Sequence, residues 1–298
     1  MKGLKILVVG EAFVDIFPKE HRIGGAPLNF AVHCAGLGST VFFAARVGDD
    51  VYGREIAQLL KNWDIDCQTV QIDPRVQTGQ VLVAVDAQGE PSFTIIGESA
   101  HDYLTWDGPP NNWPKEPFDL LYFGTMGSRH PVARKAIRRI IQEQSPKTKT
   151  FFDVNLRGKF YTKDLIEHYL HLAHFVKLNG RELDCLAKLW QWKIPPTEAL
   201  RRMANDYHID HICLTQGAQG GVALHQGQIF TYRAAECKNL VNTMGAGDAF
   251  SGALAMGLLQ GWAIETTLRR AAQLASDICQ VTGAIPASSI PQIRQGGR

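Results

Sequence analysis

Short apolar runs alternate with amphipathic segments along most of this chain, and this alternation constrains its fold more than any other feature. Runs rich in Val, Ile, Leu and Phe are typical of strands buried on both faces of a parallel sheet. Such strands are predicted at residues 6–9, 118–124, 149–156, 174–179 and 211–217. Helices are predicted at residues 131–144, 164–173, 180–189 and 197–208. This βαβα order predicts an α/β fold with three α/β/α layers, in which helices cover a mainly parallel sheet.

Two stretches break this order with the period-two alternation of a β-hairpin. In residues 78–96 a turn is predicted at residues 86–89, Asp-Ala-Gln-Gly. The apolar face of this hairpin holds Val81, Val83 and Val85. We expect it to belong to a small sheet that projects from the α/β body and has one face available to cover a ligand. The second hairpin, at residues 220–234, is predicted to form an antiparallel edge of the main sheet.

The length, composition and net charge of the chain favour one globular α/β protein without a nucleic-acid or membrane partner. The chain has 298 residues, of which 45% are hydrophobic and 20% charged, and its formal net charge is +2. No stretch approaches the roughly 18 apolar residues of a membrane span. The N-terminal apolar run is interrupted by Glu11 and Asp15, so it is predicted to be a buried strand rather than a signal peptide. Six scattered cysteines without a C-x-x-C pair indicate reduced thiols and a cytoplasmic protein.

Residues 242–261, NTMGAGDAFSGALAMGLLQG, place glycines and an acid where an apolar helix is predicted to begin. Unpaired amides and the helix dipole make such a start an anion site, and glycine lets a phosphate approach the backbone. A carboxylate beside a phosphate is repulsive, so Asp248 needs a task such as accepting the proton of an attacking hydroxyl. The alternative is a close-packed helix start in which Asp248 only complements the helix dipole.

A second candidate site follows the first predicted strand. Asp15 lies in GEAFVDI at 10–16, and Asn29 lies in the small-residue stretch GGAPLNFAVHCAGLG at 24–38. The carboxyl ends of parallel strands are where α/β proteins bind ligands. A carboxylate and an amide there suit the hydroxyls of a polyol. The alternative is an ordinary βα turn followed by a helix cap.

With these residues the chain resembles the ribokinase-like sugar kinases, also called the phosphofructokinase-B type, over nearly its whole length. Two long signatures carry the resemblance, GGAPLNFAVHCAGLGSTVFFAARVGDDVYG at 24–53 and NTMGAGDAFSGALAMGL at 242–258. Within the family, GEAFVDI, the PLN form of the first signature and DVNLR at 153–157 are most similar to fructokinases.

The resemblance implies a single ribokinase-like domain over residues 1–298, with a small β-sheet lid contributed by about 11–24 and 78–100. It implies an ATP- and Mg²⁺-dependent kinase that transfers the γ-phosphoryl group to a sugar hydroxyl, with fructose as the leading substrate. In the family the lid often forms a dimer contact, so a homodimer through the lid is implied as well.

The resemblance also implies a role for particular residues. The sugar hydroxyls would be held by Asp15, Gly25 and Asn29, with a further contact from Arg157. Asp248 would be the catalytic base, and the anion hole would consist of Gly245, Ala246 and Gly247. The nucleotide would be bound by Asn179, by Gly247 and by Thr215, Gly217 and Gly220 of the segment TQGAQG. Glu182, from the family's Asn-x-x-Glu pattern, would serve Mg²⁺ indirectly.

One departure concerns a monovalent cation. The family's second signature usually begins Asp-Thr, and its Asp helps to hold a cation beside the anion hole, whereas this chain has Asn242. The stretch VTGAIPASS at 281–289 resembles the rest of that cation loop. Potassium dependence is therefore left open.

Other functions are disfavoured by what the sequence contains. Three histidines follow one another at a spacing of three: His168, His171 and His174. On a helix, two adjacent members could bind one metal ion, but the outer pair point in different directions. A packed or solvated helix face is the alternative. The chain has neither a G-x-x-x-x-G-K-[ST] motif nor a G-x-G-x-x-G after its first strand, so a P-loop ATPase and a classical NAD dehydrogenase are disfavoured. A non-catalytic sugar-binding regulator remains an alternative, although binding alone needs no Asp248. Ribose, 2-keto-3-deoxygluconate and nucleosides remain alternative substrates.

Overall fold

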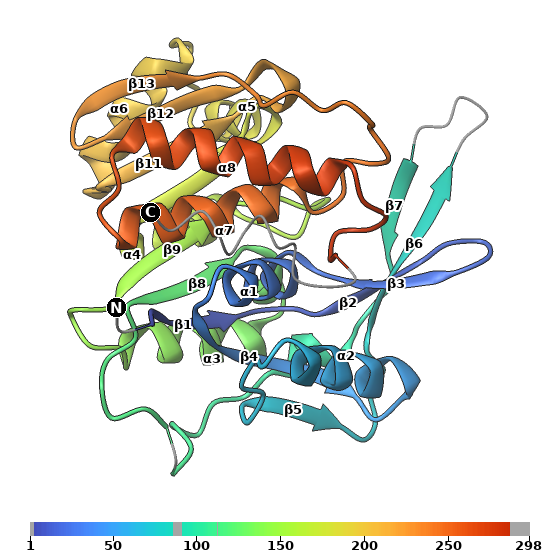
Figure 1. The fold of residues 1–298 in the computed structure, drawn as a ribbon. Helices are drawn as coiled ribbons and strands as arrows, with labels where there is room; N and C mark the ends of the chain where they lie inside the picture. Colours follow the sequence, from blue (N-terminus) through green and yellow to red (C-terminus); the bar gives the residue numbers. More distant parts are fainter. Residues whose placement is uncertain (1–2, 86–90, 112, 287–298) are drawn as a thin grey trace.

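The computed structural model describes residues 3–85, 91–111 and 113–286. Within these residues one large sheet has nine strands in the order β13-β12-β11-β10-β9-β8-β1-β4-β5 (Figure 1). Seven neighbouring strands pair in parallel: β1 (Lys5–Val9), β4 (Thr40–Gly48), β5 (Val70–Asp73), β8 (Leu120–Gly124), β9 (Lys149–Asp153), β10 (Phe175–Asn179) and β11 (His211–Thr215). The hairpin of β12 (Gly221–His225) and β13 (Gln228–Tyr232) completes one edge. The predicted parallel sheet and its antiparallel edge are confirmed.

Helices cover both faces of this sheet and enclose a separate apolar core on each. One core lies under α1 (Ala26–Gly36), α2 (Val51–Asn62), α7 (Ala246–Leu259) and α8 (Ile264–Cys279). The other lies under α3 (Pro131–Gln142), α4 (Lys163–Leu172), α5 (Gly180–Leu189) and α6 (Pro196–Tyr207). Strand β1 serves both cores, since Ile6 and Val8 enter the first while Leu7 and Val9 enter the second. No helix in the described part of the chain is long and apolar enough to cross a membrane.

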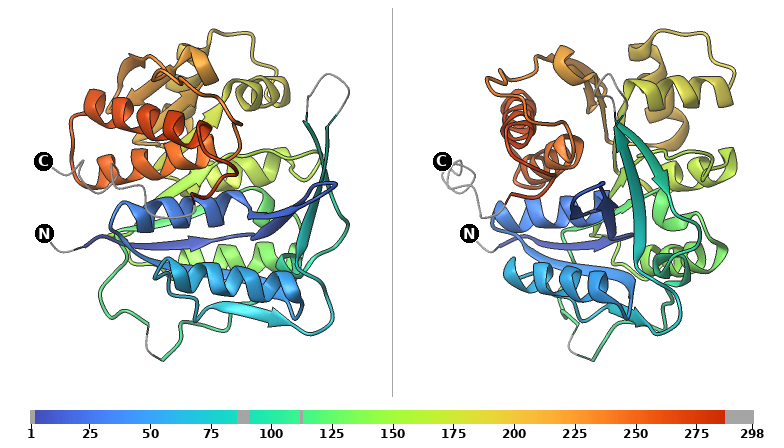
Figure 2. Two further views of the ribbon diagram at one scale, coloured as in Figure 1. Left: turned by 45° about the vertical axis from the view of Figure 1, so that its right-hand side comes forward. Right: turned by 90° about the vertical axis from the view of Figure 1, so that its right-hand side faces the viewer.

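A second sheet of four strands projects from the body, in the order β3-β2-β6-β7 (Figure 2). Its strands are β2 (Phe13–Ile16), β3 (His21–Gly24), β6 (Gly79–Val85) and β7 (Pro91–Ile95). As predicted from the alternation, Val81 and Val83 are buried while Leu82 faces outward. Val81 packs with Phe13 and Met126 at the seam between the two sheets. The predicted turn at 86–89 and the side chain of Val85 lie outside the described residues.

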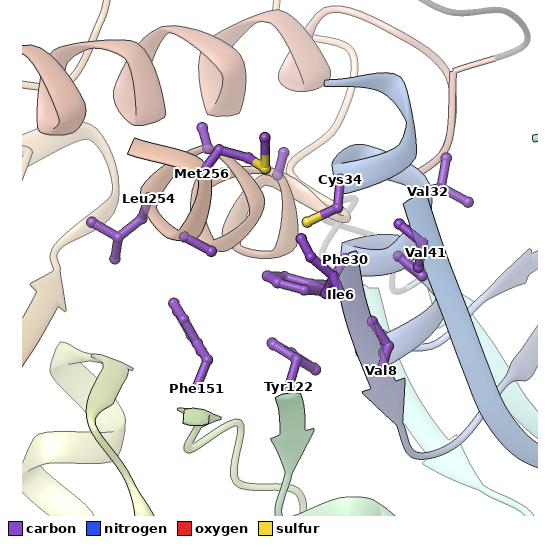
Figure 3. Packing of buried hydrophobic residues seen from close by; sticks show 14 of the residues in the cluster. Ile6, Val8, Phe30, Val32, Cys34, Val41, Tyr122, Phe151, Leu254 and Met256 are labelled. Atoms are coloured by element: carbon purple, nitrogen blue, oxygen red, sulfur yellow. The ribbon is translucent and has the colours of Figure 1, made fainter. Parts of the chain in front are cut away.

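Helices α1 and α7 pack closely side by side over the centre of the sheet (Figure 3). Glycine permits this contact, because a Cβ on Gly252 of α7 would lie only 3.2 Å from the Cβ of His33 on α1. Below them, the Phe30 ring stacks on Tyr122 of β8 with centroids 3.9 Å apart. This packing brings the amino-terminal ends of α1 and α7 together at the carboxyl edge of the sheet.

Two predicted strands end earlier in the structure than in the prediction. Strand β9 ends at Asp153 rather than at residue 156, because the chain turns at Asn155, whose φ of 38° is left-handed. Strand β11 ends at Thr215, where a 3₁₀ turn, η3 (Gly217–Gln219), leads into β12. Both ends lie at the edge where the candidate site forms.

Candidate functional site

The two candidate sites predicted from the sequence are one site in the structure. Asn29, in the first turn of α1, donates a hydrogen bond of 2.7 Å from Nδ2 to Oδ2 of Asp248, in the first turn of α7. These residues are 219 positions apart in the chain. Their contact follows from the packing of α1 against α7.

The turn that begins α7 requires glycine. Gly245 has a left-handed φ of 73°, and a Cβ on it would lie 2.5 Å from the Cβ of Ala284. The amides of the first helical residues, including Ala246 and Gly247, have no acceptor within the helix. Together with the helix dipole they form a site for an anion such as a phosphate. Asp248 lies beside these amides.

The pKa of Asp248 lies well above that of an ordinary carboxyl group. Burial raises its pKa to about 6, and the carboxylate of Asp153 adds to this effect. Lys177, the hydrogen bond from Asn29 and Arg157 oppose it. Asp248 is therefore ionised at neutral pH but close enough to its pKa to accept a proton efficiently.

A buried ion pair that we did not predict from the sequence lies under the start of α7. Lys177 of β10 is 6% exposed and places Nζ 3.2 Å and 3.3 Å from the two carboxylate oxygens of Asp153 at the end of β9. Ser251 of α7 donates to the same carboxylate at 2.9 Å. Nζ also lies 3.3 Å from the position that a Cβ on Gly247 would occupy. A lysine within the apolar run 174–179 was the available signal, since a charge in a buried strand needs a partner.

On the lid side of the site, Asp15 and Gly25 lie close to Asn29. Burial raises the pKa of Asp15, on strand β2, to about 6, and Arg157 and Arg22 oppose this rise. Gly25 is the N-cap of α1 and has a φ of 105°. Arg157 is exposed in the loop after β9, near enough to lower the pKa of both Asp15 and Asp248. The predicted sugar residues are therefore brought together.

The predicted nucleotide residues lie along the ends of β10 and β11. Asn179 and Glu182 form a capping box at the start of α5, in which Oδ1 of Asn179 accepts from the Glu182 amide at 2.9 Å. Both carboxylate oxygens of Glu182 accept from backbone amides, those of Asn179 at 2.8 Å and Leu156 at 3.1 Å. Since its oxygens are engaged, Glu182 fits a magnesium ion through bound water better than by direct ligation.

The segment 215–220 forms the turn between β11 and β12. Thr215 lies at the end of β11, and Gly217 and Gly220 both have positive φ, at 57° and 86°. A Cβ on Gly217 would meet nothing within 4 Å, whereas one on Gly220 would collide with the carbonyl oxygen of Tyr232 at 2.1 Å. Gly217 is therefore open to a ligand, and Gly220 is required by the packing of the hairpin.

Asn242 connects the loops before α7 and after α8. Its Nδ2 donates to the carbonyl oxygen of Val281 at 2.7 Å, and its Oδ1 accepts from the amide of Met244 at 2.8 Å. A carboxylate could not donate the first of these bonds. Residues 287–289 of the predicted cation loop lie outside the described residues.

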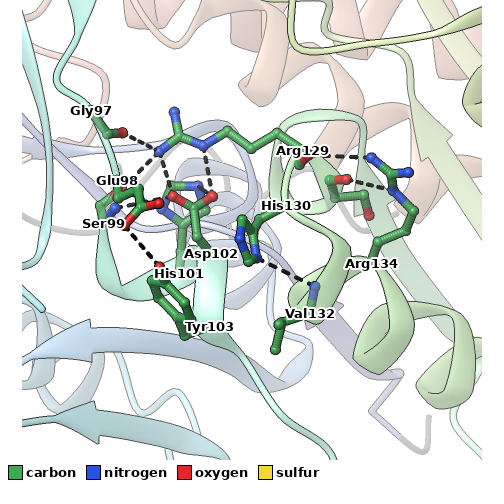
Figure 4. A network of polar contacts seen from close by, with 11 residues as sticks. Gly97, Glu98, Ser99, His101, Asp102, Tyr103, Arg129, His130, Val132 and Arg134 are labelled. Carbon is green, nitrogen blue, oxygen red and sulfur yellow. Dashed lines mark hydrogen bonds and ion pairs between the residues drawn. The ribbon is translucent and has the colours of Figure 1, made fainter.

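A second buried network that we did not predict joins the lid to the body (Figure 4). Arg129 donates from Nε and Nη2 to the two carboxylate oxygens of Asp102, at 2.7 Å and 2.6 Å, and from Nη2 to the Gly97 carbonyl oxygen at 2.6 Å. Nδ1 of His101 lies 2.9 Å from Oγ of Ser99. Burial lowers the pKa of His101 to about 4, although Asp102 opposes this, so the ring is neutral at pH 7.

The described residues contain no cluster of His, Cys, Asp and Glu that could hold a metal ion. The predicted histidine run on and after α4 has other contacts. The His171 ring packs edge-on against Tyr207 with centroids 4.8 Å apart, and Nδ1 of His174 lies 2.7 Å from Oγ1 of Thr150. These contacts are those of a packed helix face.

A buried carboxylate beside helix-start amides, next to a small second sheet on an α/β body, is an arrangement that suits an enzyme of phosphoryl transfer. Residues 8–292 match the pfkB family carbohydrate kinases, and the chain belongs to that family. It is therefore a sugar kinase of the pfkB family, a phosphotransferase, as the resemblance of the two signatures predicted.

Individual relatives share most of the chain. A fructokinase of Escherichia coli is 30% identical over 265 residues, which cover 85% of this chain and 84% of the relative. An aminoimidazole riboside kinase of Salmonella typhimurium is 29% identical over 266 residues, 85% of this chain and 81% of the relative. The crystal structure of fructokinase from Vibrio cholerae O395 with bound fructose, ADP and calcium ion has a TM-score of 0.80 at 27% identity, covering 95% of each chain.

Proposed function

We propose that the protein transfers the γ-phosphoryl group of ATP to a hydroxyl group of fructose. The observation that carries this proposal is Asp248, hydrogen-bonded to Asn29 at 2.7 Å in the first turn of α7. In the transfer, Asp248 takes the hydroxyl proton while the hydroxyl oxygen forms a bond to the γ-phosphorus. The bond from that phosphorus to the bridging oxygen breaks, and ADP leaves.

The residues of the site support separate roles for its two halves. Asp15, Gly25, Asn29 and Arg157 would hold the sugar. The amides of Gly245, Ala246 and Gly247, with Lys177 beneath them, would stabilise the negative charge of the transferring group. The ends of β10 and β11 would receive the nucleotide, through Asn179, Thr215, Gly217 and Gly220. Magnesium would neutralise phosphate charge, and Glu182 would orient its bound water.

The charges around the sugar half favour a neutral sugar. Burial raises the pKa of three carboxyl groups there, to about 7 for Glu11 and to about 6 for Asp15 and Asp248. These three carboxyl groups would repel a further negative charge. The carboxylate of a sugar acid such as 2-keto-3-deoxygluconate is therefore a poor fit to this part of the site. The similarity to fructokinases over most of the chain also supports fructose.

A sugar panel tests the proposal. ADP release is measured with fructose, ribose, 2-keto-3-deoxygluconate and a nucleoside, each with Mg²⁺ and ATP. We expect the highest kcat/KM with fructose. A higher value with another member reassigns the substrate, and thermal stabilisation by a sugar without any ADP release would indicate the regulator instead.

Two further properties belong to this proposal. We propose that the protein forms a homodimer through the outer face of the lid, where Leu82 is exposed. We also propose a reducing, cytoplasmic location, which is supported by six free cysteines.

A further inference from the structure

A buried carboxylate with one unpartnered oxygen lies just after the first strand. Glu11 follows β1 by two residues and is 3% exposed. In the part of the chain that the structure describes, its Oε2 is buried and has no hydrogen-bond partner. Leaving an ionised group in this state costs free energy that the folded protein must recover elsewhere.

Two of the three charged groups that act on Glu11 belong to the kinase site, and the third belongs to the lid network. Burial raises the pKa of Glu11 to about 7 and Asp248 adds to this rise, while a hydrogen bond from its own backbone amide, Arg157 and Arg129 oppose it. These charges come from α7, from the loop after β9 and from the turn after β8. Glu11 therefore lies within electrostatic reach of the reacting carboxylate rather than in a remote part of the core.

A purely structural ion pair does not account for Glu11. Arg129 of the lid network directs its Nε and Nη2 to Asp102 and the Gly97 carbonyl oxygen, and its buried Nη1 makes no hydrogen bond within the described residues. On the other side, the turn at Gly127 packs against the carboxylate so closely that a Cβ there would lie 3.3 Å from Oε2. The protein thus packs closely around Oε2 of this carboxylate but gives it no hydrogen bond within the described residues.

We propose that Glu11 determines substrate specificity by accepting a hydrogen bond from a sugar hydroxyl other than the one that is phosphorylated. This role rests on the proposed function only in that the ligand is a sugar. An ionised carboxylate only accepts hydrogen bonds, and a polyol supplies O–H donors. A sugar that lacks the matching hydroxyl would leave the buried carboxylate unpaired and would be rejected.

The test compares fructose with its 1-, 3-, 4- and 6-deoxy analogues in the unaltered protein and in Glu11→Gln. Hydrogen bonds to charged groups contribute about 1.5–3 kcal/mol, so the KM for fructose should rise by about 10- to 100-fold. The KM for ATP should stay within about twofold. One deoxy analogue lacks the hydroxyl that donates to Glu11. With that analogue the two proteins should have the same kcat/KM, because the hydrogen bond to Glu11 is already absent.

The control is Asp73→Asn, which removes another buried carboxylate, one that accepts from Arg46 at 2.9 Å and, within the described residues, has no contact with the proposed sugar residues. It should lower the Tm and leave the KM for fructose unchanged. If Glu11→Gln does not fold, Glu11→Asp retracts the carboxylate by one methylene and should give the same loss of selectivity.

Two results would overturn the role of Glu11. One is an unchanged KM for fructose in Glu11→Gln. The other is that Glu11→Gln lowers kcat/KM by the same factor for fructose and for every deoxy analogue. If ribose or a nucleoside proves the better substrate of the unaltered protein, the proposal of fructose fails while that of Glu11 does not. The same comparison is then made with that substrate and its deoxy forms.

Discussion

At the scale of single residues, Asp248 has two properties that oppose each other. In the first turn of a helix a carboxylate is stabilised by the dipole and the open amides. Burial and the neighbouring Asp153 nevertheless raise its pKa to about 6. The first effect alone would describe a helix-start residue, whereas the second produces a group that exchanges protons near neutral pH.

Replacement of Asp248 by Asn separates these two interpretations. The amide keeps the shape and the contact with Asn29 but cannot accept the proton, so kcat should fall by about 10²–10⁴. The affinity for ATP should be equal or higher, because a negative charge beside the phosphates is removed. Steady-state kinetics and ATP titration measure both. Asp164→Asn, at the exposed start of α4, is the matched control and should keep full activity. A kcat within a few-fold of the unaltered protein would reduce Asp248 to a helix-start residue.

Glu11 should make the stability of the protein depend on pH. Its pKa is raised from 4.5 to about 7 by folding, so the folded state binds the proton more strongly, and stability is lost as the pH rises through this window. Gln is neutral throughout, so Glu11→Gln should match the unaltered protein below pH 4.5 and exceed it by up to about 3 kcal/mol above pH 7. Urea unfolding at several pH values measures the difference. A difference that does not change with pH would show that Glu11 does not titrate in this range.

The sequence revealed only some of these residues. Asp15, Asn29 and Asp248 lie in glycine-rich motifs with recognisable chemistry. Glu11 lies in the same opening motif, but nothing in its local sequence says that its carboxylate is left without a partner. The pair of Lys177 and Asp153 is formed across neighbouring strands, so its partner could be named only once the strand order was known.

At the scale of elements, the lid is attached to the body through Arg129 rather than by apolar packing alone. The guanidinium lies in the turn after β8 and binds both the chain that leaves β7 and Asp102 of η1 (Ala100–Tyr103). Arginine suits this position because its planar fork reaches both carboxylate oxygens at once.

Arg129→Lys should loosen the base of the lid. Lysine keeps the charge but replaces the fork by a single donor group, so unfolding should require about 1–3 kcal/mol less. Hydrogen exchange in β6 and β7 should become faster without sugar, and fructose should slow it in both proteins if the lid closes over the ligand. Arg54→Lys, in an exposed pair with Asp49, is the control and should change neither quantity. Equal exchange rates in the two proteins would mean that the lid does not depend on this contact.

Asn242 joins the loop before α7 to the loop after α8 through a hydrogen bond that its side-chain amide donates. The second signature of the family usually has Asp at this position. Nδ2 of Asn242 donates directly to the Val281 carbonyl oxygen. A carboxylate at this position would face that oxygen with like charge and would need a cation between them.

Asn242→Asp should therefore introduce a response to potassium. The activity of the unaltered protein should change little between sodium and potassium salts, while that of the variant should rise several-fold in potassium. Initial rates at constant ionic strength give the answer. Asn242→Ala removes both the donor and the acceptor, introduces no charge, and should remain unresponsive. A strong potassium requirement in the unaltered protein would contradict this account.

Most elements could be predicted from the sequence, and the exceptions have physical reasons. The period-two hairpins and the buried strands of the second half were recognised because each is a local pattern. Strand β4 was not assigned, because Arg46 interrupts its apolar run. Its guanidinium is bound by Asp73 of the neighbouring strand β5, a partner that no local pattern identifies.

At the scale of the whole molecule, the lid has two faces, and only one of them packs against the body. Val81 and Val83 turn toward the seam, while Leu82 is 45% exposed on the opposite face. In the sheet register Leu82 lies between Ile16 of β2 and Thr94 of β7, so a row of side chains crosses the outer face. Leu82 is thus an exposed apolar side chain on a projecting sheet, a position that a second copy could cover.

A homodimer through this face predicts that one charge disrupts it. We expect the unaltered protein to have the mass of two chains by light scattering at micromolar concentration. Leu82→Glu should reduce the mass to one chain, because a buried unpaired charge opposes association at an isologous interface twice over. Val132→Glu, on helix α3 of the body with similar exposure, should leave the dimer intact. A single-chain mass for the unaltered protein would remove the dimer from the proposal and leave the lid as a cover for the sugar alone.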